Sequence, residues 1–240
     1  MWGAVSSAGR RDRWKSILKV VVATGVFALM HSALANQKAK TAAVHLVGER
    51  HRNAWYRPVY LVLSLVTFGA LALYVKGLPK QTLYRVRGPL AGVMQLTRLA
   101  SVGYAVYAAH HVGIPAMLGW PGLAAWWHGM AVVPRKPEAQ GPARAGGEGL
   151  RVAGPFLVSR HPLNLAPLPV LWLAPTMTVY SAVFNSVATL YFVLGSMHED
   201  RRLRASYGPA YRAYQHSDVP LYLPIFGKTR PSSAKRLDAS

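Results

Sequence analysis

Residues 163–197 read LNLAPLPVLWLAPTMTVYSAVFNSVATLYFVLGSM and contain no charged side chain. About 20 apolar residues in a helix cross the hydrocarbon core of a membrane. A run of 35 residues is therefore too long for one straight span and just long enough for two. Prolines interrupt its first half, and Pro175 with the following Thr-Met-Thr is the natural turn. The pattern predicts a helical hairpin with legs at 163–174 and 178–197, the first leg short and bent by its prolines.

Three more apolar runs precede the hairpin, at residues 17–35, 59–75 and 90–118. Each has about the length of a membrane span. The first follows a basic N-terminus, as a signal peptide would, but it is long for one, so we expect a retained helix. Residues 119–133 are too short to span, and their tryptophans are typical of the lipid headgroup level. The sequence predicts an all-α, polytopic integral membrane protein of about five transmembrane helices.

The composition supports this fold class and excludes several others. Of 240 residues, 28 are Lys or Arg and 8 are Asp or Glu, for a formal charge of +20. Hydrophobic residues make up 52% and charged residues 15%, against about 25% charged in soluble domains. A nucleic-acid binder would not need the long apolar runs, so the expected partners are the bilayer and its anionic lipids. Because the chain has no cysteine, disulfides and thiolate-bound metals are excluded.

We expect one integral-membrane domain over residues 1–240. It comprises N-terminal helices and an interfacial segment (17–135), a hairpin region (150–224) and a disordered tail (228–240). The polar stretch at 36–58 is expected to be a loop. About twice as many Lys and Arg residues lie on the side of the C-terminus as on the other side. The positive-inside rule then places the basic, Tyr-rich C-terminus in the cytoplasm, with the chain in a bacterial inner membrane.

Two polar segments flank the hairpin and are brought to the same membrane face by it. Residues 154–162 read GPFLVSRHP, and Glu199-Asp200 follow the uncharged run. Arg160, His161 and Glu199 can therefore share one polar pocket. Asp200, the next position on a helix, is expected to point about 100° away, toward Arg204. Three tyrosines at i, i+4 and i+7 share one helical face further on, namely Tyr207, Tyr211 and Tyr214.

Each of these features also has a simpler structural interpretation. Arg160 and His161 could anchor the chain among lipid headgroups, and Glu199 and Asp200 could pair with the arginines that follow them. The three tyrosines could form an interfacial belt. Their order around a single hairpin favours a functional site over three separate coincidences.

The whole arrangement resembles the C-terminal region of membrane methyltransferases. It consists of Gly-Pro-aromatic, Arg-His-Pro, the hairpin, an acidic residue, Tyr-Gly-x-x-Tyr-x-x-Tyr and a late Val-Pro. This superfamily includes isoprenylcysteine carboxyl methyltransferases, phospholipid methyltransferases, methanethiol methyltransferases and NnrU-like proteins. The resemblance covers about residues 150–224. It extends more weakly to His31-Ser32 and to Tyr56-Arg57 before Tyr60.

The resemblance implies S-adenosylmethionine as cofactor, held between the hairpin and the C-terminal segment at the cytoplasmic face. It implies that Arg160 and Glu199 are catalytic, with Arg160 orienting an anion. Cofactor contacts carried over by position are His161, Pro162, Glu199, Tyr207, Tyr211 and Tyr214. The expected substrate pocket contains His31, Asn164 and Trp172. Many relatives have an aromatic residue and a glycine where this chain has Asn164 and Ala166, which leaves the small or lipophilic acceptor open: thiol, carboxylate, amine or phenol.

The chemistry of methyl transfer agrees with this interpretation. In-line displacement from a sulfonium needs proximity and a desolvated pocket, and little acid–base chemistry if the acceptor is already an anion. A carboxylate at position 199 can pair with the cofactor's ammonium or ribose hydroxyls. Aromatic rings can face the sulfonium or stack on adenine.

Other functions stay open at this point. The chain could be an NADPH-dependent membrane reductase, because sterol reductases have a similar Arg-His-Pro pattern. It could also be a non-enzymatic, NnrU-like membrane component of nitrogen-oxide metabolism. Nine histidines also suggest a metal or haem, but only His110 and His111 are adjacent, so we expect no metal site. An intramembrane histidine is still a candidate functional residue, which makes His31 the one to test. The oligomeric state is open.

Overall fold

The computed structural model describes residues 7–78, 81–134, 138–144 and 149–223. It is mostly helical, with 75% helix and a few short strands. The N-terminal part comprises α1 (Ser7–Ala35), α2 (Gln37–Val47), α3 (Glu49–Gly77), β1 (Thr82–Arg85), α4 (Pro89–Val112), α5 (Ile114–Leu118) and α6 (Trp120–Trp127). The C-terminal part comprises β2 (Ala143–Arg144), β3 (Leu150–Arg151), the 3-10 helix η1 (Gly154–Leu157), α7 (Pro162–Leu165), α8 (Pro167–Trp172), β4 (Thr176–Thr178), α9 (Val179–Tyr207) and α10 (Pro209–His216).

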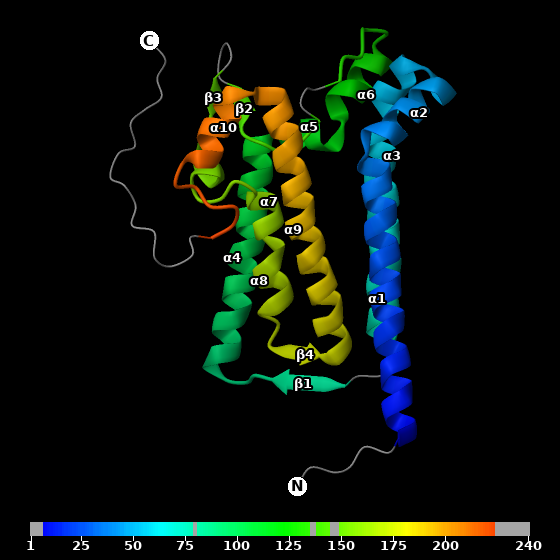
Figure 1. The fold of residues 1–240 in the computed structure, drawn as a ribbon, viewed down its shortest axis with the longest axis vertical. Helices are drawn as coiled ribbons and strands as arrows, with labels where there is room; N and C mark the ends of the chain where they lie inside the picture. The colour runs from blue at the N-terminus through cyan, green and yellow to red at the C-terminus, as the bar shows by residue number, and fades with distance from the viewer. Residues whose placement is uncertain (1–6, 79–80, 135–137, 145–148, 224–240) are drawn as a thin grey trace.

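The long helices lie side by side along one axis (Figure 1). α1 packs against α3 and α9, and α4 packs against α8. The chain runs up α1, down α3, up α4, down α7 and α8, and up α9. The start of α1 therefore lies at one end of the bundle, with β1 and β4. α2, α6 and α10 gather at the other end, where the polar residues discussed below are found.

Within the described ranges, three helices are long and apolar enough to cross a membrane: Trp14–Ala35, Glu49–Gly77 and Val179–Tyr207. Apolar side chains such as Leu29 and Leu65 are more than 70% exposed on them, as expected for surfaces that face lipid. The other two expected spans do not meet this criterion. Residues 90–118 are divided at Gly113 into α4 and α5, and the first hairpin leg is split into α7 and α8. The count of five transmembrane helices remains a prediction.

The turn of the hairpin lies where the prolines predicted it, between Pro175 and Thr178. The backbone N–H of Val86 donates to the carbonyl of Pro175 at 2.7 Å, and β1 pairs antiparallel with β4. The hydroxyl of Thr178 accepts a hydrogen bond from the backbone of Ser181 at 3.1 Å and caps α9. The all-α prediction holds for most of the chain but did not include these two short strands. Strands this short show no alternation in the sequence, so only long-range pairing reveals them.

The stretch expected to be a loop at residues 36–58 is helical instead. Asn36 caps α2 by accepting a hydrogen bond from the backbone of Lys38 at 3.0 Å. Gly48, at a φ of 79°, makes the break that lets α3 begin at Glu49. α3 continues through Pro58, so its polar first turns are part of the same rod as its apolar span. This places the basic side chains of α2 and of the first turns of α3 at the polar end of the bundle.

Candidate active site

Asp200 is the acceptor at the centre of a buried polar cluster. Its Oδ1 atom accepts hydrogen bonds from Nε2 of His161 at 2.7 Å and from the hydroxyl of Tyr211 at 2.6 Å. Its Oδ2 atom accepts from Nε2 of Gln215 at 2.9 Å and from Nη1 of Arg160 at 3.3 Å. One carboxylate on α9 thereby joins the Arg-His-Pro loop to α10.

The expectation that Asp200 points away toward Arg204 is therefore wrong. Glu199 also contacts the cluster: its Oε2 atom lies 3.3 Å from Nδ1 of His161. Its Oε1 atom accepts a hydrogen bond from the backbone N–H of Gln140 at 2.5 Å. Consecutive helix positions do diverge by about 100°, but the imidazole lies between the two side chains and reaches both.

His161 has a fully buried side chain whose two ring nitrogens both face carboxylates. Burial disfavours the charged imidazole, but hydrogen bonds to Asp200 and Glu199 outweigh it and raise the pKa of His161. As an imidazolium, the ring can donate one hydrogen bond to each acid. The cluster then contains two cations, Arg160 and His161, and two carboxylates.

The free energy of unfolding is expected to fall as the pH rises through the folded-state pKa of His161. That pKa is raised above the unfolded value of 6.5, so the folded protein binds this proton more tightly. The stabilisation is fully present below the unfolded pKa and is lost above the folded one. Denaturant unfolding in detergent between about pH 5.5 and 9.5 measures the effect. The loss should be absent in His161→Gln, and equal pH dependence in both proteins would contradict the assignment.

The C-terminal segment holds the Arg-His-Pro loop through the backbone. The N–H of Arg160 donates to the carbonyl of Pro220 at 3.0 Å, and the N–H of His161 donates to that of Leu221 at 3.3 Å. The hydroxyl of Ser159, itself buried, donates to the same Leu221 carbonyl at 2.8 Å. The late Val-Pro motif of the sequence therefore orients the loop that carries Arg160 and His161.

The three tyrosines of the sequence pattern use their hydroxyls to hold this region together. Tyr214 donates to the carbonyl of Phe156 at 2.6 Å, and Tyr207 donates to that of Pro142 at 3.0 Å. Tyr211 belongs to the Asp200 cluster, where burial and the adjacent carboxylate raise the pKa of its phenol. Tyr211 and Tyr214 are buried in the core with Phe156. Their role as cofactor contacts stays a prediction.

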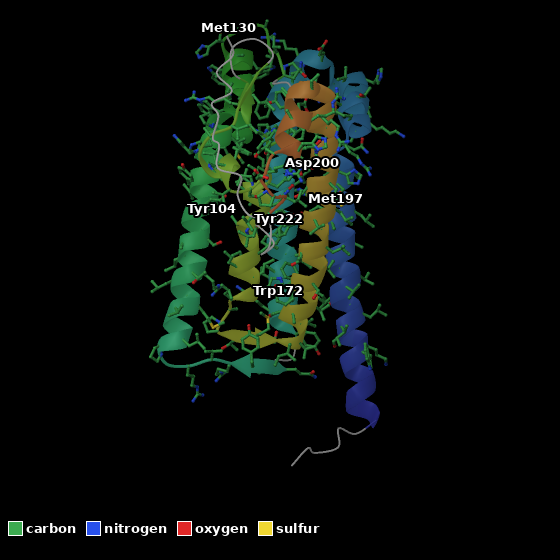
Figure 2. The ribbon with its side chains drawn as sticks, turned by 60° about the vertical axis from the view of Figure 1, so that its left-hand side comes forward. Tyr104, Met130, Trp172, Met197, Asp200 and Tyr222 are labelled. Carbon is green, nitrogen blue, oxygen red and sulfur yellow. The ribbon has the colours of Figure 1, made fainter. Side chains whose placement is uncertain are left out.

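Of the remaining residues predicted for the site, Pro162 is buried as the first residue of α7, next to His161. Asn164 donates from Nδ2 to Oγ of Ser196 at 2.8 Å, one turn before Glu199 on α9. Trp172 lies far along the bundle from Asp200, toward β1 and β4 (Figure 2). Its Nε1 atom donates to Thr189 at 2.9 Å. The structure therefore does not bring Trp172 together with the other predicted residues.

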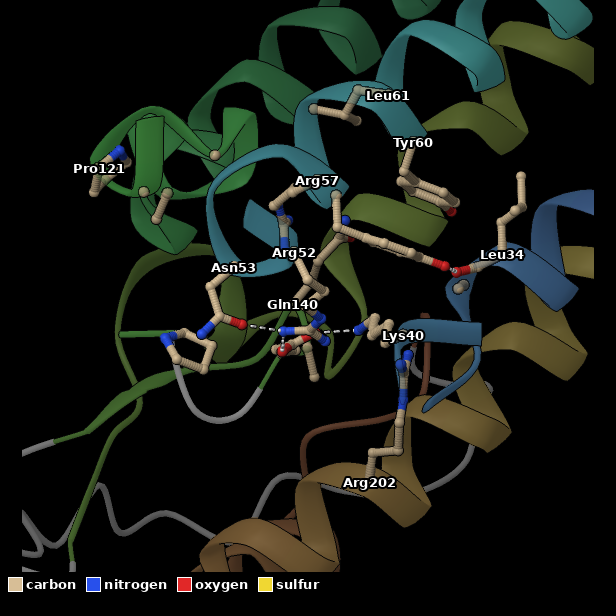
Figure 3. A pocket seen from close by; sticks show the side chains of 18 of the residues that line it. Leu34, Lys40, Arg52, Asn53, Arg57, Tyr60, Leu61, Pro121, Gln140 and Arg202 are labelled. Carbon is tan, nitrogen blue, oxygen red and sulfur yellow. Dashed lines mark hydrogen bonds and ion pairs between the residues drawn. The ribbon is translucent and has the colours of Figure 1, made fainter. Parts of the chain in front are cut away.

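A cavity of about 230 Å³ lies beside the cluster, bordered by α1, α2, α3, the end of α4, α5, α6, α9 and the segments at residues 133–134 and 138–140. Leu34, Tyr60 and Leu61 lie on one side of it, and Lys40, Gln140 and Arg202 lie on the other (Figure 3). Glu199 lines the cavity, whereas Asp200 does not. Glu199 is therefore shared between the cavity and the His161 cluster.

The charged side of the cavity contains an ion-pair network that sequence reasoning missed. Glu138 pairs with Lys40 and also accepts from Nη1 of Arg52 at 3.0 Å. Burial would raise the pKa of Glu138, but hydrogen bonds and charge from Lys40 and Arg52 hold it below its ordinary value. No local pattern links these residues, because Glu138 lies 98 positions after Lys40. Only the fold of α2 against α3 brings them together.

His31 lies in α1, facing α3 and α9. Its Nδ1 atom is 3.0 Å from Oγ of Ser64, and its Nε2 atom is 2.5 Å from the hydroxyl of Tyr60. The rings of Phe27 and Tyr191 pack against the imidazole. Both ring nitrogens therefore have side-chain partners. Among the residues that the structure describes, no three His, Asp or Glu side chains group closely enough to hold a metal ion.

Comparison with known proteins supports the family resemblance. Proteins named methanethiol S-methyltransferase from Crocosphaera subtropica and Pseudomonas deceptionensis are 39% and 35% identical over 69 residues, 29% of this chain. The chain spans only 27% and 26% of the length of these two relatives. A Mycobacterium tuberculosis protein of the same name is 26% identical over 212 residues, covering 88% of this chain and 79% of that protein. No family model matches the chain, and no solved structure matches it significantly.

Proposed function

We propose that this chain, a member of the isoprenylcysteine methyltransferase-like family of membrane methyltransferases, transfers a methyl group from S-adenosylmethionine to a small thiol. The thiol comes from the activity named for the relatives. Those names favour methyl transfer over the reductase and the non-enzymatic interpretations. The observation that carries the proposal is Glu199, whose carboxylate lines a cavity while bonded to the buried His161 cluster.

The polar side of the cavity suits the amino-acid end of S-adenosylmethionine, which carries an ammonium and a carboxylate. Glu199 and Arg202 are three positions apart on α9, so they lie on one helix face, and both line the cavity. The Nε atom of Arg202 is buried without a hydrogen-bond partner among the described residues. A buried donor of this kind is costly unless it is paired, which a ligand carboxylate would do. Glu199 would hold the ammonium and Arg202 the carboxylate.

The cofactor supplies a methyl group on a positively charged sulfur, and the protein supplies position and exclusion of water. The Asp200 cluster fixes Arg160 and His161 against α9, which in turn fixes the direction of Glu199. The side with Leu34, Tyr60 and Leu61 offers an apolar surface for the acceptor. A thiol there would meet the methyl group in a low-dielectric pocket. Arg160 is then a positioning residue, since its guanidinium pairs with the carboxylate of Asp200.

The proposal is tested with detergent-purified protein. Calorimetry should show binding of S-adenosylmethionine and not of NADPH. Incubation with ethanethiol and S-adenosylmethionine labelled in the methyl group should produce the labelled thioether, detected by gas chromatography. Binding of NADPH alone would move the protein to the reductase interpretation. Binding of neither ligand would favour the non-enzymatic one.

The site should lie at the cytoplasmic end of the bundle, and the N-terminus should lie at the opposite end. The basic residues of α2, α10 and the first turns of α3 belong to elements at the end that carries the site, as the positive-inside rule requires for a cytoplasmic face (Figure 1). A phosphatase reporter fused after Ser240 should be inactive, and a fluorescent reporter at the same point should be active. Activity of the phosphatase fusion would contradict this orientation, since that enzyme matures only outside the cytoplasm.

A further inference from the structure

The hydrogen-bond partners of His31 fix the position of its proton. The single hydroxyl hydrogen of Ser64 is donated to the backbone carbonyl of Tyr60 at 2.7 Å. Oγ of Ser64 must therefore act as acceptor toward Nδ1 of His31. A neutral imidazole protonated at Nδ1 has its lone pair on Nε2. The Tyr60 hydroxyl, 2.5 Å away, then donates its hydrogen to Nε2.

Tyr60 is both a hydrogen-bond partner of His31 and a residue that lines the cavity. It lines the cavity beside Leu34 and Leu61, away from Lys40 and Arg202 (Figure 3). Because its own hydrogen is committed to His31, its oxygen can offer only lone pairs to a bound molecule. A thiol on the apolar side would find a hydrogen-bond acceptor there.

We propose that Tyr60 takes the proton of the thiol acceptor and that His31 receives the proton of Tyr60. This inference rests on the proposed function and adds the residues that activate the acceptor. The S–H bond breaks as an O–H bond forms on Tyr60, and the original phenol hydrogen moves to Nε2 of His31. The sulfur lone pair forms the new bond to the methyl carbon. The bond from that carbon to the donor sulfur breaks with its electrons staying on that sulfur, which becomes neutral.

After methyl transfer, His31 is an imidazolium and the acceptor is a thioether. The proton returns through Tyr60 to water when the products leave the cavity. Such a relay is useful because even a cysteine thiol, with a pKa near 8.5, is only a few per cent thiolate at pH 7, and a simple alkyl thiol is a weaker acid still. Arg57 also lines the cavity, and a cation there favours the developing thiolate.

The kinetic test compares two acceptors at pH 7. With ethanethiol, Tyr60→Phe and His31→Gln should lower kcat by at least about thirtyfold, which is the ratio of total thiol to thiolate for a cysteine-like thiol at that pH, and ethanethiol is a weaker acid than cysteine. With 4-nitrobenzenethiol, which is already ionised, both variants should stay within about threefold of wild type. Equal slowing with both thiols would show that Tyr60 and His31 only shape the pocket, and it would overturn the relay.

Tyr191→Phe is the matched control. The Tyr191 ring packs on His31, and its hydroxyl accepts from Ser32 at 3.2 Å instead of bonding the imidazole. It does not line the cavity. This variant should keep wild-type kcat with both thiols. A loss with ethanethiol as large as that of Tyr60→Phe would mean that packing around His31, and not the proton path, sets the rate.

A second measurement is independent of activity. In protein labelled with ¹⁵N-histidine, the signals missing from His31→Gln identify this ring, and they should report a protonated Nδ1 and an unprotonated Nε2. The Nε2 signal should shift in Tyr60→Phe and not in Tyr191→Phe. An Nε2-protonated ring would overturn the relay even in an active enzyme. A correct tautomer in a protein that binds no S-adenosylmethionine would refute the proposed function, and with it the use of the relay, while confirming the proton placement.

Discussion

Replacing Glu199 with glutamine is expected to lower the affinity for S-adenosylmethionine about tenfold to a hundredfold. Glutamine keeps the size of the side chain and can still accept the hydrogen bond from the backbone of Gln140. It removes the negative charge that faces the cavity. A hydrogen bond to a charged group contributes roughly 1.5–3 kcal/mol, which corresponds to this range of affinity. Calorimetry in detergent on wild type and variant measures the change directly.

Glu49→Gln is the control for this measurement. Glu49 is exposed at the start of α3, at the same end of the molecule, and does not line the cavity. Its loss changes the net charge by the same amount and should leave the affinity unchanged. If Glu199→Gln binds as wild type does, the amino-acid end of the cofactor does not contact Glu199, and the assignment of the polar side of the cavity is wrong.

The hairpin could be predicted from the sequence, and so could the proximity of the polar segments before and after it, residues 154–162 and 199–200. An uncharged run of 35 residues with prolines in its first half has few ways to be accommodated in a membrane. Once it folds back, His161 and Glu199 must lie at the same end. The structure places them 3.3 Å apart, although 38 positions separate them in the chain.

The partners of each acid could not be predicted in the same way. The helical period says that Glu199 and Asp200 diverge, but not which of them faces the loop. That depends on how α9 packs against α1, α8 and α10. The same limit explains why Glu138 and its cationic partners were missed. A residue in a polar segment gives no local sign that it will be buried in an ion-pair network.

A chemical role for His31 follows only when the sequence and the structure are taken together. In the sequence it is a lone polar residue in an apolar helix, which makes it a candidate functional residue but does not indicate a reaction. The structure adds two partners from α3, Ser64 and Tyr60, with geometry that orients the ring. The weak resemblance around Tyr60 could have suggested the pairing, but the spacing alone does not show which residues of α3 face α1.

The largest expected loss of stability is for Asp200→Asn, at about 3–5 kcal/mol, as measured when one partner of a buried ion pair is removed. The side chain of Asp200 is only 11% exposed, and its carboxylate accepts from four donors. The amide nitrogen of asparagine is itself a donor and would face at least one of these four donors. The substitution also leaves the charges of Arg160 and His161 without their closest counterion. The midpoint of thermal unfolding in detergent should fall by roughly 6–20 °C, at 2–4 °C per kcal/mol for a chain of this size.

Asp218→Asn provides the matched control, because Asp218 is exposed just after the end of α10 and its loss should shift the midpoint by less than about 2 °C. The variant also separates stability from binding. Asp200 does not line the cavity, so protein that remains folded at low temperature should bind S-adenosylmethionine within a few-fold of wild type. A loss of binding with an unchanged midpoint would show instead that Asp200 contacts the cofactor. In that case the carboxylate that holds the Arg-His-Pro loop would also be the one that holds the ligand.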